Sequence, residues 1–153
     1  MRYTSIALFF ILCAFVPLCL FASSWQIQTI DDSLDDVGMY SSIACDSLGR
    51  AHISYTNLTT GGLKYTYFNG STWTTNNVGT TGSSGYYTSI DLDSNNCPHI
   101  SHYNATYQRL LHTKGAGTAS SIVDQSYVGK FSSLKIDIEQ YPNISYYDEN
   151  KKA

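Results

Sequence analysis

Three copies of one sequence decide the fold of this chain: Ser42-Ile-Ala-Cys-Asp-Ser-Leu-Gly-Arg-Ala-His-Ile-Ser-Tyr55, Ser89-Ile-Asp-Leu-Asp-Ser-Asn-Asn-Cys-Pro-His-Ile-Ser-His102 and Ser133-Leu-Lys-Ile-Asp-Ile-Glu-Gln-Tyr-Pro-Asn-Ile-Ser-Tyr146. The copies start 47 and then 44 residues apart in a chain of 153 residues. A period of this size is typical of repeat architectures, in which each copy forms one supersecondary unit.

Each copy begins a unit of short strand-like runs. In the first unit the runs are predicted at Ser42–Asp46, His52–Thr56, Leu63–Phe68 and Trp73–Val78, because apolar residues alternate with polar ones as they do along a strand. Turn signals separate the runs at Asp46 to Gly49 and at Asn69-Gly70. Asn96 takes the place of Gly49 in the second copy, and both residues tolerate the left-handed conformation that such turns need. Gln140 in the third copy predicts a weaker turn.

Four-stranded units of this length are the blades of a β-propeller. The sequence therefore predicts an all-β propeller of antiparallel four-stranded blades, of which about two and three-quarters are present. The blades are expected at residues 40–78, 87–125 and 131–153. Residues 25–30 are expected to form an outer strand that completes the last blade, since Trp25 and Ile30 have the spacing of Trp73 and Val78.

Closing a propeller ring takes about four to eight blades. This chain must therefore either be part of a longer protein with further blades or associate with copies of itself. We favour the first alternative, because the sequence stops inside a blade.

The first 24 residues are set apart by their composition. Arg2 is followed by an apolar run from Ile6 to Ala22, and then by Ser23 and Ser24. This order is typical of a secretory signal peptide cleaved after Ala22 or Ser24, which would place the protein outside the cell or on its surface. The alternative is an uncleaved membrane anchor, although Pro17 interrupts the run and a spanning helix needs about 20 residues.

The repeat carries a family resemblance. Its pattern of Ser-Ile, Asp-Ser and His-Ile-Ser, followed by Leu63-Lys-Tyr65, Asn69-Gly70 and Trp73, resembles that of secreted microbial β-propeller repeat proteins, which are often grouped with the sialidase-like, Asp-box propellers. The resemblance covers about Trp25 to Asn150, but no segment contains a complete Asp-box. It implies a fold more than a function, because most members of this kind are uncharacterised surface or secreted proteins.

No catalytic residues are predicted. The resemblance implies that a sialidase would clamp a carboxylate with several arginines, and beyond the N-terminal segment the chain has only Arg50 and Arg109. The alternative is that the chain is the N-terminal part of an extracellular propeller hydrolase (a sialidase-like glycosidase) or lyase whose catalytic residues lie in missing blades. The net charge of −3 disfavours nucleic acid as a partner, because phosphate binding depends on an excess of Lys and Arg.

Tyrosine suggests a binding function, since the chain has 13 of them and an aromatic ring with a hydroxyl suits glycan or protein recognition. The candidate ligand-binding residues are Tyr55, Tyr103, Tyr147, His52 and His99. His52 and His99 occupy one repeat position, but the third copy has Asn143 there, which disfavours a metal site. The competing interpretation for the tyrosines is packing between blades, and for the histidines hydrogen bonding to a hairpin.

Asp46, Asp93 and Asp137 recur at the end of the first run in each unit. Their predicted role is to cap the following turn by accepting backbone hydrogen bonds. Calcium is the minority interpretation for Asp91 to Asn95 and for the cluster of Asp31, Asp32, Asp35 and Asp36, which is expected to be a solvated loop. No cofactor and no bound metal are therefore expected.

Two further residue types complete the prediction. Asn57, Asn69, Asn104 and Asn143 match the N-glycosylation pattern, which matters only in a host that glycosylates secreted proteins. Cys45 is expected as a buried apolar thiol and Cys97 as an incidental turn residue, with no disulfide between them. Together, these features predict a secreted, non-enzymatic propeller module that binds glycans or extracellular proteins.

Overall fold

The computed structural model describes residues 25–78 and 82–152 and consists of ten β-strands. They form three antiparallel sheets, each in chain order. The first sheet contains β1 (Val37–Cys45), β2 (Ala51–Asn57), β3 (Gly62–Phe68) and β4 (Trp73–Val78). The second contains β5 (Tyr86–Leu92), β6 (Pro98–Asn104), β7 (Arg109–Lys114) and β8 (Ser120–Asp124). The third contains β9 (Val128–Ile136) and β10 (Pro142–Asp148).

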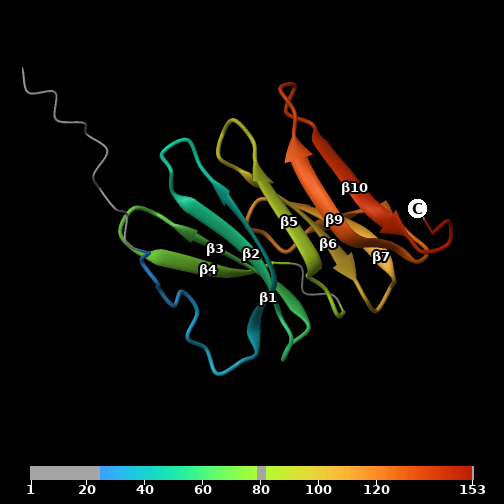
Figure 1. The fold of residues 1–153 in the computed structure, drawn as a ribbon, viewed down its shortest axis with the longest axis horizontal. Helices are drawn as coiled ribbons and strands as arrows, with labels where there is room; N and C mark the ends of the chain where they lie inside the picture. Colours follow the sequence, from blue (N-terminus) through green and yellow to red (C-terminus); the bar gives the residue numbers. More distant parts are fainter. Residues whose placement is uncertain (1–24, 79–81, 153) are drawn as a thin grey trace, which may run out of the picture.

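The all-β prediction with four-stranded antiparallel units is confirmed. No sheet is closed, and the described residues form three successive sheets that follow one another from left to right in Figure 1. None of the described segments is a helix long and apolar enough to cross a membrane. The predicted signal peptide at 1–24 lies outside the described residues.

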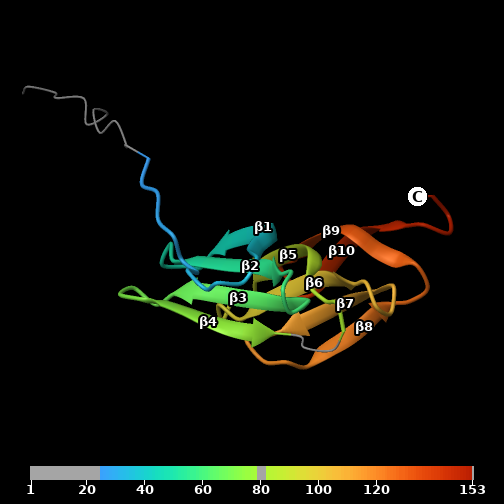
Figure 2. The ribbon, with the colours of Figure 1, turned by 90° about the horizontal axis from the view of Figure 1, so that it is seen from below.

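The expected outer strand at residues 25–30 is absent from the structure. Trp25 and Ile27 are almost fully exposed. A strand forms by hydrogen bonding to a neighbouring strand, and the strand beside which this segment was expected to pair is not among the described ones. In Figure 2 the segment comes in from outside the body toward the first sheet, where Asp31, the next residue, accepts a hydrogen bond from the Tyr55 hydroxyl.

The sheets pack face to face, and their first strands are in contact: β1 packs on β5, and β5 packs on β9. Between the first two sheets lies a core of Leu63, Tyr65 and Val78 on one side and Ile90 and Ile100 on the other. Burying this apolar surface stabilises the stack by about 25 cal/mol per Å² removed from water. The first and second sheets therefore each contribute half of this core.

Equivalent positions in the three units share backbone dihedral angles even where their residue types differ. Four positions in each unit have a positive φ, between 50° and 106°. They are Gly38, Gly85 and Gly129; Tyr40, Tyr87 and Phe131; Gly49, Asn96 and Gln140; and Gly61, Gln108 and Lys152. The first two sets lie beside an irregularity in strand pairing at the start of β1, β5 and β9. Gln140 adopts the same left-handed turn as Gly49 and Asn96, so the turn that Gln140 was expected to weaken still forms.

The aspartate at the end of each first strand accepts hydrogen bonds from the following turn. Asp46 Oδ1 accepts from the backbone N–H groups of Leu48 and Arg50 at 2.9 and 2.8 Å. Asp93 Oδ1 accepts two equivalent bonds, both of 2.9 Å, and Asp137 Oδ1 accepts one of 2.8 Å from Tyr141. These contacts are those that a turn-capping role requires. Burial would raise the pKa of Asp46, but the hydrogen bonds from Arg50 and Leu48 outweigh it and lower that pKa to about 2.

Hydroxyl groups link each sheet to the next in the same way. Ser42 Oγ accepts a hydrogen bond from the Ile90 N–H at 3.2 Å, and Ser89 Oγ accepts one from the Leu134 N–H at 2.9 Å. The hydroxyls of Thr88 and Ser132 donate to the carbonyl oxygens of Tyr40 and Tyr87, at 2.8 and 2.9 Å. The hydrogen bonds that join the first sheet to the second are thus repeated between the second sheet and the third.

Candidate functional site

Aromatic rings from successive first strands stack into what we call the aromatic column, formed by Tyr40, Tyr87 and Phe131. The ring centroids of Tyr40 and Tyr87 are 4.7 Å apart, and those of Tyr87 and Phe131 are 4.6 Å apart. These spacings lie in the range of favourable aromatic pairs. Phe131 is 67% exposed, while Tyr40 and Tyr87 are half-buried, so the column presents ring surface to solvent.

All three residues of the aromatic column have left-handed backbones, with φ of 53° or 54°. This conformation costs about 1–2 kcal/mol for a residue with a side chain. It persists because the neighbouring sheet fixes the backbone, as when Thr88 holds the Tyr40 carbonyl group and Ser132 the Tyr87 carbonyl group. Such strain, when the surrounding structure maintains it, is concentrated at functional sites.

Further groups surround the aromatic column. The ring centroids of Tyr86 and Tyr40 are 5.5 Å apart, and those of Tyr147 and Phe131 are 6.5 Å apart. Lys130 Nζ lies 5.6 Å from the centre of the Tyr103 ring and 2.5 Å from Glu149 Oε1. Ring faces, a charged pair and phenolic hydroxyls are therefore available within one small region.

The structure buries four of the five candidate ligand-binding residues that the sequence suggested: Tyr55, Tyr103, His52 and His99. Tyr147, beside the aromatic column, is half-buried. The Tyr55 hydroxyl donates to Asp31 at 2.7 Å. These four side chains therefore pack between elements of the chain and present little surface to a ligand.

His52 and His99 instead belong to two buried polar ladders. His52 Nδ1 lies 2.6 Å from the Tyr65 hydroxyl oxygen and His52 Nε2 lies 3.7 Å from Asp46 Oδ2. In the second sheet, His99 Nδ1 lies 3.1 Å from His112 Nε2 and His99 Nε2 lies 3.5 Å from Asp93 Oδ2.

The third copy keeps the same ladder with an amide, since Asn143 Nδ2 donates to Asp137 Oδ2 at 2.9 Å. Burial lowers the pKa of His52 and of His99, which favours the neutral form of both imidazoles. Within the described part of the chain, no group of three His, Cys, Asp or Glu side chains is placed to hold a metal. In the first two units, these side chains therefore extend from the aspartate that caps the first turn to the third strand of the sheet.

Part of the acidic loop binds the first sheet, which corrects the expectation of a solvated loop. Asp31 accepts bonds from Tyr55 and from Lys64 Nζ, both of 2.7 Å. Burial opposes ionisation of Asp31, but the hydrogen bonds from Lys64 and Tyr55 hold its pKa well below the usual range. Asp124 accepts the equivalent bond from Tyr146, at 2.6 Å, in the third sheet. Asp31 thus contacts the first sheet as the end of β8 contacts the third.

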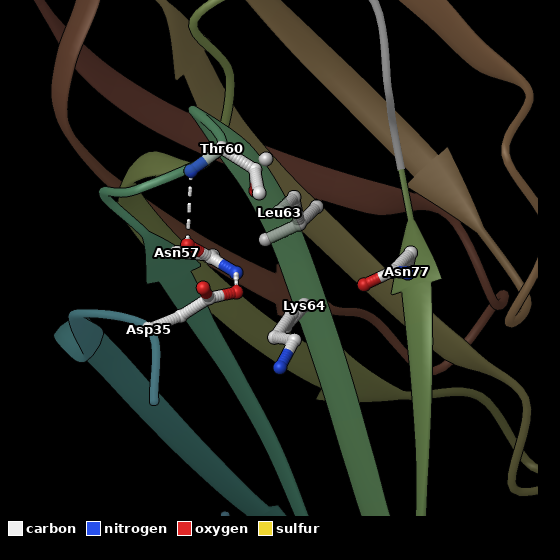
Figure 3. A pocket seen from close by; sticks show the side chains of 7 residues that line it. Asp35, Asn57, Thr60, Leu63, Lys64 and Asn77 are labelled. Carbon is white, nitrogen blue, oxygen red and sulfur yellow. Dashed lines mark hydrogen bonds between the residues drawn. The ribbon is translucent and has the colours of Figure 1, made fainter. Parts of the chain in front are cut away.

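The same loop borders a polar pocket of about 320 Å³ at the β2–β3 turn (Figure 3). Asp35, Asn57, Lys64 and Asn77 lie around this space. Asn57 donates to Asp35 Oδ2 at 2.7 Å and accepts from the Thr60 N–H at 3.1 Å. Leu111 takes the place of Lys64 in the second sheet, so the charge of Lys64 at this pocket has no counterpart there.

The remaining expectations concern asparagine and cysteine. Asn57 and Asn104 are buried, and each accepts a hydrogen bond from the turn that follows. Asn69 and Asn143 are exposed. The two described cysteines are free thiols, and Cys45 is exposed, so the expectation that it is buried is wrong. Asp91 Oδ2 accepts a hydrogen bond from the Ile136 N–H at 2.9 Å, which uses one oxygen of the suggested calcium loop.

The aromatic column was not among the residues predicted from the sequence. Its signal is a glycine followed two residues later by an aromatic residue, at Gly38–Tyr40, Gly85–Tyr87 and Gly129–Phe131. The spacings of 47 and 44 residues match those of the main repeat. The pattern lies just before each of the three copies that define the repeat.

No protein-family model matches this chain, and none of the curated proteins matches it.

Proposed function

We propose that this chain is a non-enzymatic β-propeller module that binds glycans at the cell exterior. The observation that carries the proposal is the aromatic column, three partly exposed rings kept in a strained backbone conformation at one repeat position. Sugar rings present apolar C–H faces, which pack on aromatic faces, and hydroxyls, which bond to polar groups nearby. Tyr40, Tyr86, Tyr87 and Tyr147 supply phenolic hydroxyls, and Lys130 with Glu149 supplies charges.

Two observations support the propeller. The sheets follow one another by the same hydroxyl contacts, as blades related by one rotation would. Their first strands are in contact, whereas the strand order places β4 and β8 at the far edges. In such a fan the first strands lie nearest the axis, and the aromatic column lies at one inner rim of the ring.

The extracellular hydrolase or lyase is the rival function. Among the described residues its candidate arginines have structural roles: Arg50 Nε lies 2.6 Å from Asp46 Oδ2, and the Arg109 guanidinium lies 4.5 Å from the centre of the Tyr107 ring. A sialidase-like enzyme would therefore need further arginines to clamp a carboxylate, which the alternative places in missing blades.

A glycan array with the full chain and two variants tests the proposal. Phe131→Ala removes the most exposed ring of the aromatic column and is expected to lower glycan binding at least about tenfold, since stacked aromatic anchors dominate such surfaces. Tyr141→Ala is the control, because Tyr141 is similarly exposed (68%) in the β9–β10 turn. Equal losses in both variants, or no binding by the unaltered chain to any glycan, would contradict the proposal.

A further inference from the structure

The two faces of each sheet differ in chemistry. One face, which we call the serine face, presents Ser42 and Ser54 in the first sheet, Ser89 and Ser101 in the second, and Ser133 and Ser145 in the third. The opposite face, the apolar face, presents Ile43 and Ile53, Ile90 and Ile100, and Leu134 and Ile144. This alternation follows from the two-residue period of a strand.

Both interfaces within the chain join a serine face to an apolar face. Ser42 and Ser89 each accept a backbone N–H from the apolar face of the next sheet. The Ser54 hydroxyl lies 2.8 Å from that of Thr88, and the Ser101 hydroxyl lies 2.9 Å from that of Ser132. As a result, Ile90 and Leu134 are only 3% and 2% exposed.

Among the described residues, one face of each kind is covered by no other sheet, on the first and third sheets, which stand at the two ends of the stack in Figure 1. On the first sheet, Asp31 covers only the part of the apolar face around Tyr55. On the first sheet, Ile43 is 63% exposed and the neighbouring Cys45 is exposed. On the third sheet, Ser133 and Ser145 are exposed, although the equivalent Ser54 and Ser101 are fully buried. Across their first two strands, the open faces thus repeat the contact that joins successive sheets within the chain, although the described third sheet has no counterparts of β3 and β4.

We infer that the open serine face of the third sheet binds the open apolar face of the first sheet in a second copy of this chain, head to tail. The bonds within the chain define the contact: Ser133 Oγ of one copy accepts from the Ile43 N–H of the other, and Ser145 packs beside Ser41, which holds the repeat position of Thr88 and Ser132. Both contacts form in a pair of copies, which brings together four four-stranded and two two-stranded sheets, a number of sheets within the range of about four to eight blades known for closed rings.

Sedimentation velocity and light scattering of the full chain, under reducing conditions because Cys45 lies on the apolar face, test the inference. We expect a dimer at about 100 µM, a concentration that saturates even an interface of micromolar affinity. Ile43→Asp and Ser145→Asp each place a charge on one open face and are expected to give monomers. Leu34→Asp, in an exposed loop, is the control and is expected to remain dimeric.

Mixing the two monomeric variants separates head-to-tail binding from other modes. The Ile43→Asp copy keeps its serine face and the Ser145→Asp copy keeps its apolar face, so an equimolar mixture is expected to form a 1:1 dimer through one intact interface. A chain that is monomeric at about 100 µM, variants that stay dimeric, or a mixture that stays monomeric while both variants keep their circular dichroism spectra would overturn the inference. Because the measurement is of mass, its outcome is independent of glycan binding.

Discussion

Gly85 lies directly against Leu63, so that a Cβ atom on Gly85 would fall 2.8 Å from Leu63 Cα. Gly129 has the same relationship to Leu110, whereas a Cβ on Gly38 would meet nothing within 4 Å. We therefore expect Gly85→Ala to lower the free energy of unfolding by more than about 2 kcal/mol, through both backbone strain and a clash between sheets. Gly38→Ala, with strain alone, is expected to cost about 1–2 kcal/mol. Urea denaturation measures both, and equal costs would mean that the sheets do not approach this closely.

The left-handed position at Gln108 offers a stabilising substitution. Gln108 has a φ of 50°, and its counterpart in the first unit is Gly61. Gln108→Gly is expected to raise the free energy of unfolding by about 0.5–1 kcal/mol, because the relief of strain exceeds the entropy that glycine loses on folding. Gln125→Gly, at a position without a positive φ, is the control and is expected to lower stability. A fall in the Tm of Gln108→Gly would argue against the turn conformation described here.

Stability is expected to fall in two steps on acidification. Burial lowers the pKa of His102 to about 3, and burial with the nearby His99 lowers that of His112 to about 4. Between about pH 6.5 and pH 4 the unfolded chain therefore binds more protons at these sites, so stability falls as the pH falls. Below about pH 4, where the pKa values of Asp46, Asp93 and Asp137 are depressed, the turn-capping carboxylates lose their contribution as they are protonated.

Replacing His112 by its counterpart in the first unit separates the two steps. His112→Tyr reproduces the contact between His52 and Tyr65 and removes one titrating group. Chemical denaturation at a series of pH values is expected to show a shallower dependence between pH 6.5 and about 4, and an unchanged one below about 4. The same slope as in the parent chain across the upper window would show that His112 does not titrate there.

Burial divides the four glycosylation motifs into two pairs. In a host that attaches N-glycans, peptide mass spectrometry of the folded protein is expected to find glycan at Asn69 and Asn143 and none at Asn57 and Asn104. Each buried asparagine accepts a hydrogen bond from its turn, and a glycan would force that turn open. Glycan on Asn104 in material with native stability would contradict this arrangement.

The strands could be predicted from the sequence because the apolar alternation and the turn residues act locally. The run predicted at His52–Thr56 lies within β2, and that at Trp73–Val78 coincides with β4. The strand expected at 25–30 did not form, since its existence depends on a distant partner. The exposure of Cys45 could not be predicted for the same reason: its strand alternation was correct, but none of the described sheets covers that face.

The candidate site was harder to predict. Sequence alternation assigns Tyr55 and Tyr103 to a face but does not tell whether another element covers that face. The aromatic column depends on backbone conformations that are rare for Tyr and Phe, and neighbouring sheets impose these through Thr88 and Ser132. The residues around one such position do not reveal that a neighbouring sheet will hold its backbone in the left-handed conformation.

The unlike faces of each sheet give the stack a direction, with a serine end and an apolar end. If copies associate as inferred, each copy joins its serine end to the apolar end of the next, so the assembly grows with one polarity, as in a polar filament. If the rotation per sheet fails to bring the ends of a small assembly together, the same contact continues without limit and yields a fibre. Ile43 is exposed at the apolar end, where each new copy would bind. A single charge at this position is therefore expected to stop linear polymerisation.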